Sequence, residues 1–134
     1  MKFIVHTDGG ARGNPGPAAV GVVIEDGAKK RLQEFGKRIG EATNNIAEYT
    51  AVAEALRAIK QLAGESPDIE CYLDSTLVVN QLNGLFKIKD ATLRSLATDI
   101  RILEQEVGGV VHYSVVPREQ NRRADYLVNQ ALDS

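Results

Sequence analysis

The sequence predicts an α/β fold built on a mixed β-sheet, and two patterns support this class. Three strand patterns follow one another near the N-terminus, over residues 2–9, 18–25 and 31–40. Helical and strand patterns then alternate to the end of the chain, as they do in folds with parallel strands. The 134 residues contain no repeat, low-complexity tract or linker, so we expect a single domain over residues 1–134.

The first three strands are expected to form an antiparallel meander. The first strand, KFIVHTDG, is apolar on both faces, as a central strand would be. The turn after it contains Asn14, Pro15 and Gly16, which is typical of a type II turn with a positive φ at Gly16. A second turn, in EDGAKK, separates the second and third strands.

The pattern becomes helical from Asn45, with an apolar stripe that reaches Ala63, and Gly64 ends the helix. The later elements are a strand over 68–74, helices over about 75–83 and 90–106, a strand over 110–117 and a last helix whose stripe runs from Ala124 to Leu132. Right-handed crossovers allow strands one, four and five to run parallel. Ligands of such sheets collect at the carboxyl ends of the parallel strands.

Acidic residues occur at this predicted edge. Asp8 ends the first strand and Asp74 ends the fourth, Glu48 lies inside an apolar helix stripe, and Asp125 lies early in the last helix. Taken singly, each has a structural alternative: a turn for Asp8, a capping box with Asn45 for Glu48, and an N-cap for Asp74. Taken together, four carboxylates at one edge would repel one another without compensating cations.

Magnesium is the cation that this residue set indicates. Hard oxygen ligands suit Mg²⁺, and four carboxylates are about what a pair of ions would need. A zinc site is not expected, because the sequence has no Cys/His cluster with zinc spacing. The formal net charge of −2 argues by itself against a nucleic-acid binder, but it becomes +2 once four carboxylates serve bound metal.

The compartment is expected to be the cytoplasm. The N-terminus has only three consecutive apolar residues, too few for a signal peptide or a membrane span. The single cysteine, Cys71, cannot form a disulfide within the chain, which fits a reducing environment. We expect a soluble protein with no membrane partner.

Four segments together resemble ribonuclease H of type 1: TDGGARGNPGPAAVG, TNNIAEYTAVAEAL, YLDSTLVVNQLNG and NRRADYLVNQAL. They contain Asp8, Glu48, Asp74 and Asp125 in the order and context of that family. The resemblance implies a five-stranded mixed sheet of strand order 3-2-1-4-5 flanked by helices. It also implies a divalent-metal endonuclease that hydrolyses the RNA strand of RNA/DNA hybrids and leaves 5′-phosphate and 3′-hydroxyl ends.

The resemblance further implies the function of each acid. Asp8 would bridge two Mg²⁺ ions, with Mn²⁺ as a possible replacement. Glu48 and Asp74 would hold the ion near the leaving oxygen. Asp125 would help to hold the ion that activates water.

Substrate contacts are implied at further matched positions. Short amides and hydroxyls suit the 2′-hydroxyls in the shallow minor groove, and glycines at the strand end would admit a ribose and its phosphate. The positions are Gly9, Gly10, Asn14, Thr43, Asn44, Asn45 and Thr76. For Asn44 and Asn45, helix capping is an alternative that can operate at the same time.

The chain also departs from the family. The loop before the last acid, VPREQNRRAD, lacks the histidine that many members carry, and Arg118 or Glu119 are candidates to replace it. The basic handle of some bacterial members and a hybrid-binding domain are not found in the sequence, and a monomer is expected. The alternative function is a noncatalytic nucleic-acid-binding module of the same fold, although no acid is missing.

Overall fold

The computed structural model describes residues 1–62, 64 and 66–134. Its five strands form one sheet in the order β3-β2-β1-β4-β5, which confirms the expected fold class and strand order. The antiparallel meander consists of β1 (Lys2–Ala11), β2 (Gly16–Asp26) and β3 (Arg31–Ala42). On the other side of β1, the parallel strands are β4 (Asp68–Leu73) and β5 (Val110–Val115).

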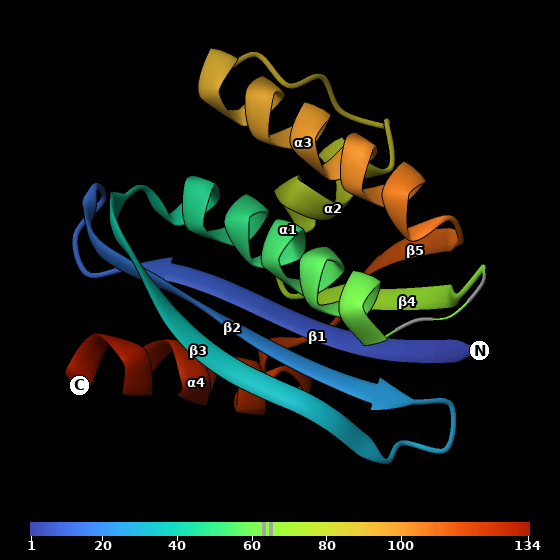
Figure 1. The fold of residues 1–134 in the computed structure, drawn as a ribbon. Helices are drawn as coiled ribbons and strands as arrows, with labels where there is room; N and C mark the ends of the chain where they lie inside the picture. The colour runs from blue at the N-terminus through green and yellow to red at the C-terminus, as the bar shows by residue number, and fades with distance from the viewer. Residues whose placement is uncertain (63, 65) are drawn as a thin grey trace.

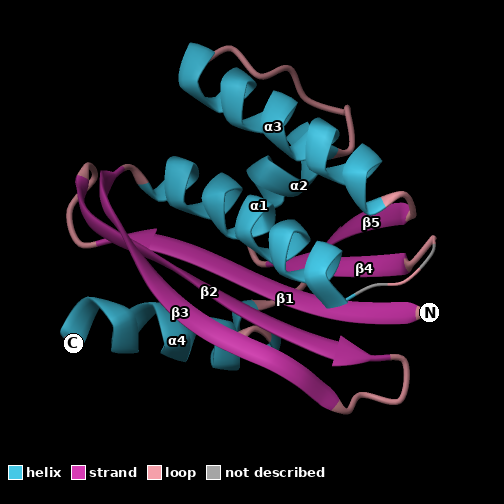
Figure 2. Ribbon diagram, in the orientation of Figure 1, coloured by secondary structure: helices cyan, strands magenta, loops and turns pink. Residues whose placement is uncertain are grey.

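Helices cover both faces of the sheet (Figure 1). One face carries α1 (Asn44–Leu62), α2 (Thr76–Leu82) and α3 (Ala91–Val107), and the other carries α4 (Arg122–Asp133) (Figure 2). A single 3₁₀ turn, Arg118–Gln120, precedes α4. Ala63, the predicted last member of the stripe on α1, lies outside the described residues. None of the described helices combines the length and the apolar character that a membrane crossing requires.

The main core lies between the sheet and the layer of α1, α2 and α3. Phe3 and Val5 of β1 and Ile69 of β4 alternate toward this layer and are fully buried. β2 is buried continuously from Ala18 to Ile24, because α1 covers one of its faces and α4 covers the other. This two-sided burial explains the unbroken apolar run of β2 in the sequence.

α4 packs directly on the backbone of β2 and β3 at a pair of glycines. Gly21 and Gly36 are cross-strand partners. A Cβ atom on Gly21 would overlap the carbonyl oxygen of Ala124, and one on Gly36 would overlap the carbonyl oxygen of Leu127. The two glycines therefore set the depth at which α4 rests on the sheet.

The turn between β1 and β2 differs from the predicted type II turn. The Asn14–Pro15 peptide bond is cis, and the positive φ, 99°, is at Gly13 rather than at Gly16. The loop is closed by a hydrogen bond from Arg12 N to Pro17 O of 2.8 Å, so it is longer than a four-residue turn. Gly16 is already part of β2.

We expect Gly21→Ala to lower the free energy of unfolding by about 1–3 kcal/mol, because the added methyl group must displace α4 from the sheet. Urea unfolding followed by circular dichroism measures the change. Gly64→Ala is the matched control, since a Cβ atom there meets no atom of the described residues within 4 Å. Equal stability of the two variants would contradict this account of how α4 packs.

Candidate active site

The site forms where β1 continues beyond the end of β4. Pairing of β1 with β4 ends at His6 and Tyr72, whereas pairing of β1 with β2 continues to Ala11. From Thr7 onward, one edge of β1 therefore has no neighbouring strand. Backbone groups that are buried in this way need other hydrogen-bond partners.

Side chains from the helical segments satisfy this free edge of β1. The hydrogen bonds are Asn121 Nδ2 to Thr7 O at 2.8 Å, Gly9 N to Glu48 Oε1 at 2.5 Å and Ala11 N to Asn44 Oδ1 at 2.9 Å. The same bonds fix the starts of α1 and α4 relative to Asp8, which lies between the bonded residues of β1.

Neither Glu48 nor Asp74 caps a helix, contrary to the structural alternatives that the sequence offered. The N-terminus of α1 is capped by Thr43, whose Oγ1 accepts from Ile46 N at 3.2 Å. The N-terminus of α2 is capped by Ser75, the residue after Asp74. The predicted capping box of Asn45 with Glu48 is wrong because α1 begins at Asn44, and Glu48 bonds to β1 instead.

Three of the four predicted acids form a tight cluster. Carboxylate oxygens of Asp8, Glu48 and Asp74 lie within 4.8 Å of one another. Asp8 and Glu48 are only 8% and 6% exposed. Oδ2 of Asp74 is buried and has no hydrogen-bond partner among the described residues, and Arg118 Nε lies 3.8 Å from it, too far for a hydrogen bond.

Burial and mutual repulsion act on the protonation of this cluster. Burial, followed by the charge of Asp74, raises the pKa of Asp8 to about 7. Burial, followed by the charges of Asp8 and Asp74, raises the pKa of Glu48 well above its ordinary value. Burial also raises the pKa of Asp74, against the opposing effect of Arg118. A cation bound by the three carboxylates would stabilise their ionised forms.

Asp125 lines the same cavity from α4 but is not part of the three-carboxylate cluster. Its charge adds to the rise in the pKa of Asp8. The cavity has a volume of about 370 Å³. It is lined by Asp8, Gly9, Gly10, Ala11, Arg12, Asn44, Asn45, Glu48, Asp74, Ser75, Arg118, Asp125, Val128, Asn129 and Leu132. The fold thus brings the four predicted acids, from four different elements, to one cavity.

Asn121 is a residue of the site that the sequence analysis did not single out. It is 1% exposed, and its side chain donates to Thr7 O while its own carbonyl accepts from Asp125 N at 3.1 Å. It therefore ties the turn that carries Asp125 to the residue before Asp8. In the sequence, an asparagine before a helix indicates only an N-cap, and its partner on β1 is 114 residues away.

The predicted substrate residues divide among three cavities. Gly9, Gly10, Asn44 and Asn45 line the acid cavity. A neighbouring cavity of about 500 Å³ shares Asn44 and Asn45 and is also lined by Asn14 and Thr43. A third, of about 520 Å³, is lined by Thr76 together with Asp74 and Arg118. These positions therefore surround the acids on more than one side.

Several of these side chains also have structural hydrogen bonds. Asn14 Oδ1 accepts from Asn44 N at 3.0 Å, and Asn44 Oδ1 accepts from Ala11 N. Both asparagines use their oxygen within the protein, so the amide nitrogen is the group that a ligand would meet. Thr43 similarly uses Oγ1 at the helix cap.

Close packing of α1 against β1 explains why residue 9 is a glycine. A Cβ atom on Gly9 would overlap backbone atoms of Ala47 and Glu48, so its absence is needed for α1 to approach β1. A Cβ atom on Gly10 would meet only Val128 Cγ1, at 3.7 Å, which is an ordinary contact. The sequence analysis predicts that both glycines admit the substrate. Packing alone accounts for Gly9, whereas for Gly10 that prediction stays open.

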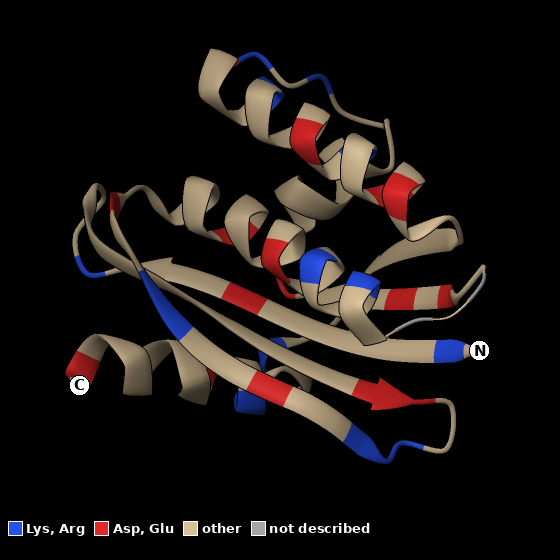
Figure 3. Ribbon diagram, in the orientation of Figure 1, with Lys and Arg blue, Asp and Glu red and all other residues tan. Residues whose placement is uncertain are grey.

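Basic and acidic segments are interspersed along the fold, with basic positions on β3 and in the loop before α3 and acidic ones on β4 (Figure 3). Two basic side chains, Arg12 and Arg118, line the acid cavity. Of the two candidates for the missing loop histidine, Arg118 therefore lies at the site. Glu119 does not line this cavity.

The chain is similar to known proteins over almost its whole length. The family described as "Reverse transcriptase-like" matches residues 6–131. Ribonuclease HI of Halobacterium salinarum is 45% identical over 96% of this chain and 63% of its own length. The crystal structure of RNase H1 from that archaeon has a TM-score of 0.93 at 41% identity and covers 99% of this chain and 98% of its own.

The structure of LC11-RNase H1 in complex with RNA/DNA hybrid has a TM-score of 0.91 at 42% identity, over 98% of this chain and 96% of that one. The "Bifunctional protein Rv2228c" of Mycobacterium tuberculosis is 39% identical over all of this chain, which spans only 36% of that protein's length. Because the matched region contains all four acids and nearly the full length of two solved type 1 structures, the chain belongs to the ribonuclease H type 1 family.

Proposed function

We propose that residues 1–134 form one catalytic domain that hydrolyses the RNA strand of RNA/DNA hybrids and leaves 5′-phosphate and 3′-hydroxyl ends. The observation that carries this proposal is the cluster of Asp8, Glu48 and Asp74, whose oxygens lie within 4.8 Å in a cavity. Three like charges at this separation are unfavourable unless a cation joins them. The 42% identity to LC11-RNase H1, which was solved with an RNA/DNA hybrid, supports the same substrate class.

Mg²⁺ is the ion that we propose, with Mn²⁺ as the alternative. The cluster offers only carboxylate oxygens, which hard cations prefer, and the orphaned Oδ2 of Asp74 is a buried acceptor without a partner. When bound, two such ions would activate the attacking water and stabilise the leaving oxygen. Asp8 would be their shared ligand, with Glu48 and Asp74 on one ion and Asp125 on the other.

The protein's own contacts prepare these ligands. Gly9 N donates to Oε1 of Glu48, which holds the carboxylate in one orientation and leaves Oε2 for an ion. Asn121 holds the start of α4, so that Asp125 faces the same cavity as Asp8. Such preorganisation lowers the cost of arranging charges during the reaction.

The flanking cavities supply the surface for the hybrid. The amide nitrogens of Asn14 and Asn44 are donors for sugar and base-edge acceptors, and Asn45, Thr43, Gly10 and Thr76 line the same region. We also propose that the domain acts as a monomer in the cytoplasm. The acid cavity is formed within one chain, and the buried free thiol of Cys71 fits a reducing compartment.

Cleavage of matched RNA/DNA, RNA/RNA and DNA/DNA duplexes with Mg²⁺ or Mn²⁺ tests this function. We expect cleavage of the RNA strand of the hybrid, and we expect Asp8→Asn to lower kcat by about a thousandfold or more, because metal binding supplies several kcal/mol to the transition state. Circular dichroism shows whether the variant is folded. Hybrid binding without products would instead identify a noncatalytic module.

The metal-free protein should lose stability as the pH rises. The folded pKa of Asp8, about 7, is above its ordinary value of 3.8, so the folded state holds more protons than the unfolded state between these values. The free energy of unfolding of the metal-free protein therefore falls as the pH rises from 3.8 to about 7, by on the order of a few kcal/mol. Thermal melting in a chelating buffer measures this loss.

Two comparisons isolate the cluster in that experiment. Asp8→Asn should show a flatter pH dependence than the parent protein, because it removes the group with the raised pKa. Mg²⁺ should raise the melting temperature more above pH 7 than at acidic pH, where protons compete for the carboxylates. A melting temperature that depends neither on pH nor on Mg²⁺ would contradict the proposal that these carboxylates bind metal.

Arg118→Ala should lower kcat about tenfold. Its guanidinium lies at the cavity beside Asp74, but at 82% exposure its effect should be smaller than the hundredfold or more typical of a buried donor. Glu119→Gln is the matched control from the same 3₁₀ turn, and its kcat should stay close to that of the parent. Initial rates of hybrid cleavage give both kcat values. A larger loss in Glu119→Gln than in Arg118→Ala would instead identify Glu119 as the residue that replaces the loop histidine.

A further inference from the structure

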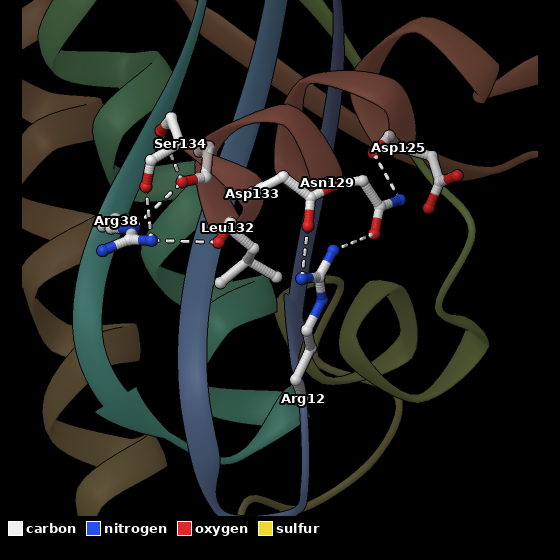
Figure 4. A network of polar contacts seen from close by, with 8 residues as sticks. Arg12, Arg38, Asp125, Asn129, Leu132, Asp133 and Ser134 are labelled. Carbon is white, nitrogen blue, oxygen red and sulfur yellow. Dashed lines mark hydrogen bonds and ion pairs between the residues drawn. The ribbon is translucent and has the colours of Figure 1, made fainter.

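Arg12 lines the acid cavity, yet the proposed chemistry gives it no task. It lies in the loop between β1 and β2 and reaches the last turns of α4 (Figure 4). Its Nη1 lies 2.5 Å from Oδ1 of Asp133, and its Nη2 lies 3.5 Å from Oδ1 of Asn129. A charged side chain at the wall of this cavity is thus held by another charge of the same protein.

The ion pair is not needed to complete the end of α4. Arg38 already satisfies the carbonyl groups there, with bonds to Ala131 O and Leu132 O at 2.9 Å and to Ser134 O at 2.7 Å. Asp133 itself is unfavourable in the last turn, because the negative end of the helix dipole repels a carboxylate. The ion pair between Arg12 and Asp133 is therefore not explained by stabilisation of the end of α4.

The pair is easy to open. The side chains of Arg12 and Asp133 are 49% and 63% exposed. Exposed pairs of this kind contribute little to stability, and Asp133 can be hydrated without moving. A phosphodiester offers two nonbridging oxygens that match the planar fork of a guanidinium, so it competes well for Arg12.

The position of Arg12 suits a phosphate next to the one that is cut. Asn129, which contacts Arg12, also donates to the carbonyl of Asp125 at 3.1 Å, one helical turn earlier. Arg12, Asn129 and all four acids line the same cavity. A strand that enters this cavity with its scissile phosphate at the acids would therefore reach the wall that Arg12 forms.

We propose that Arg12 binds a phosphate group of the nucleic acid close to the scissile phosphate, and that Asp133 holds Arg12 until this phosphate displaces it. The inference rests on the proposed function. It adds a binding residue at the flank of the cavity and a carboxylate that competes with the substrate for that residue.

Hybrid binding without divalent metal, where the labelled duplex stays intact, tests the proposal by fluorescence anisotropy over a range of salt concentrations. Arg12→Ala should raise Kd about tenfold, the effect of about 1.4 kcal/mol. It should also reduce the slope of log K against log salt by about 0.9, the value for one phosphate contact. With Mg²⁺, its KM for the hybrid should rise by a larger factor than its kcat falls.

Asp133→Asn should act in the opposite direction and lower Kd about two- to fivefold, because it removes the competing charge. Arg31→Ala is the matched control. Arg31 is 48% exposed and pairs with Glu34 at 2.9 Å, but it lies at the start of β3, away from the acid cavity. Its Kd and salt slope should equal those of the parent, and melting temperatures show that all three variants are folded.

Two results would overturn the inference while leaving the proposed function intact. In the first, the parent cuts the hybrid and Arg12→Ala binds it as Arg31→Ala does. In the second, Arg12→Ala and Asp133→Asn both weaken binding and both lower the melting temperature, which identifies a purely structural ion pair. A parent protein that neither binds nor cuts the hybrid would overturn the proposed function and this inference together.

Discussion

The free edge of β1 is the constraint on which the site depends. β4 stops at the level of His6, and the backbone of β1 beyond that point must find hydrogen bonds outside the sheet. Side chains from the start of α1, from Glu48 and from Asn121 provide them. The requirement to satisfy one strand edge thus determines where two helices begin, and with them where two of the four acids lie.

The same geometry places three carboxylates so close together that they repel one another, and Arg118, the nearby cation, offsets this only in part. Burial and close approach raise the pKa values of Asp8, Glu48 and Asp74, and one oxygen of Asp74 has no hydrogen-bond partner in the part of the chain that the structure describes. An arrangement of this kind is a poor contributor to stability and a good one to cation binding. Its position at the carboxyl end of β4, beside the extension of β1, follows the general rule for ligand sites in α/β sheets.

Much of this could be predicted from the sequence, because it depends on patterns that are local. The alternation of β1 and the helical period after Asn45 indicate their elements directly, and Asp74 follows β4 as predicted, whereas Asp8 lies inside β1, which continues to Ala11. Partners far apart in the sequence could not be predicted. Nothing near Glu48 indicates that it bonds to Gly9, and Asn121 has the pattern of an ordinary cap although its side chain bonds to Thr7. The space needed by Ala47 likewise explains Gly9 only once α1 has been placed.

Because α4 lies on the opposite face of the sheet, the acids of the site are held by two different parts of the fold. Asp8, Glu48 and Asp74 belong to one continuous body formed by β1, β4 and α1, whereas Asp125 belongs to a helix that rests on the glycine pair Gly21 and Gly36. A small shift of α4 along the sheet therefore displaces Asp125 more than the other three carboxylates, apart from its tie to β1 through Asn121. Changes at the glycine pair, which never touch an acidic residue, can therefore alter how Asp125 contributes to the proposed metal site.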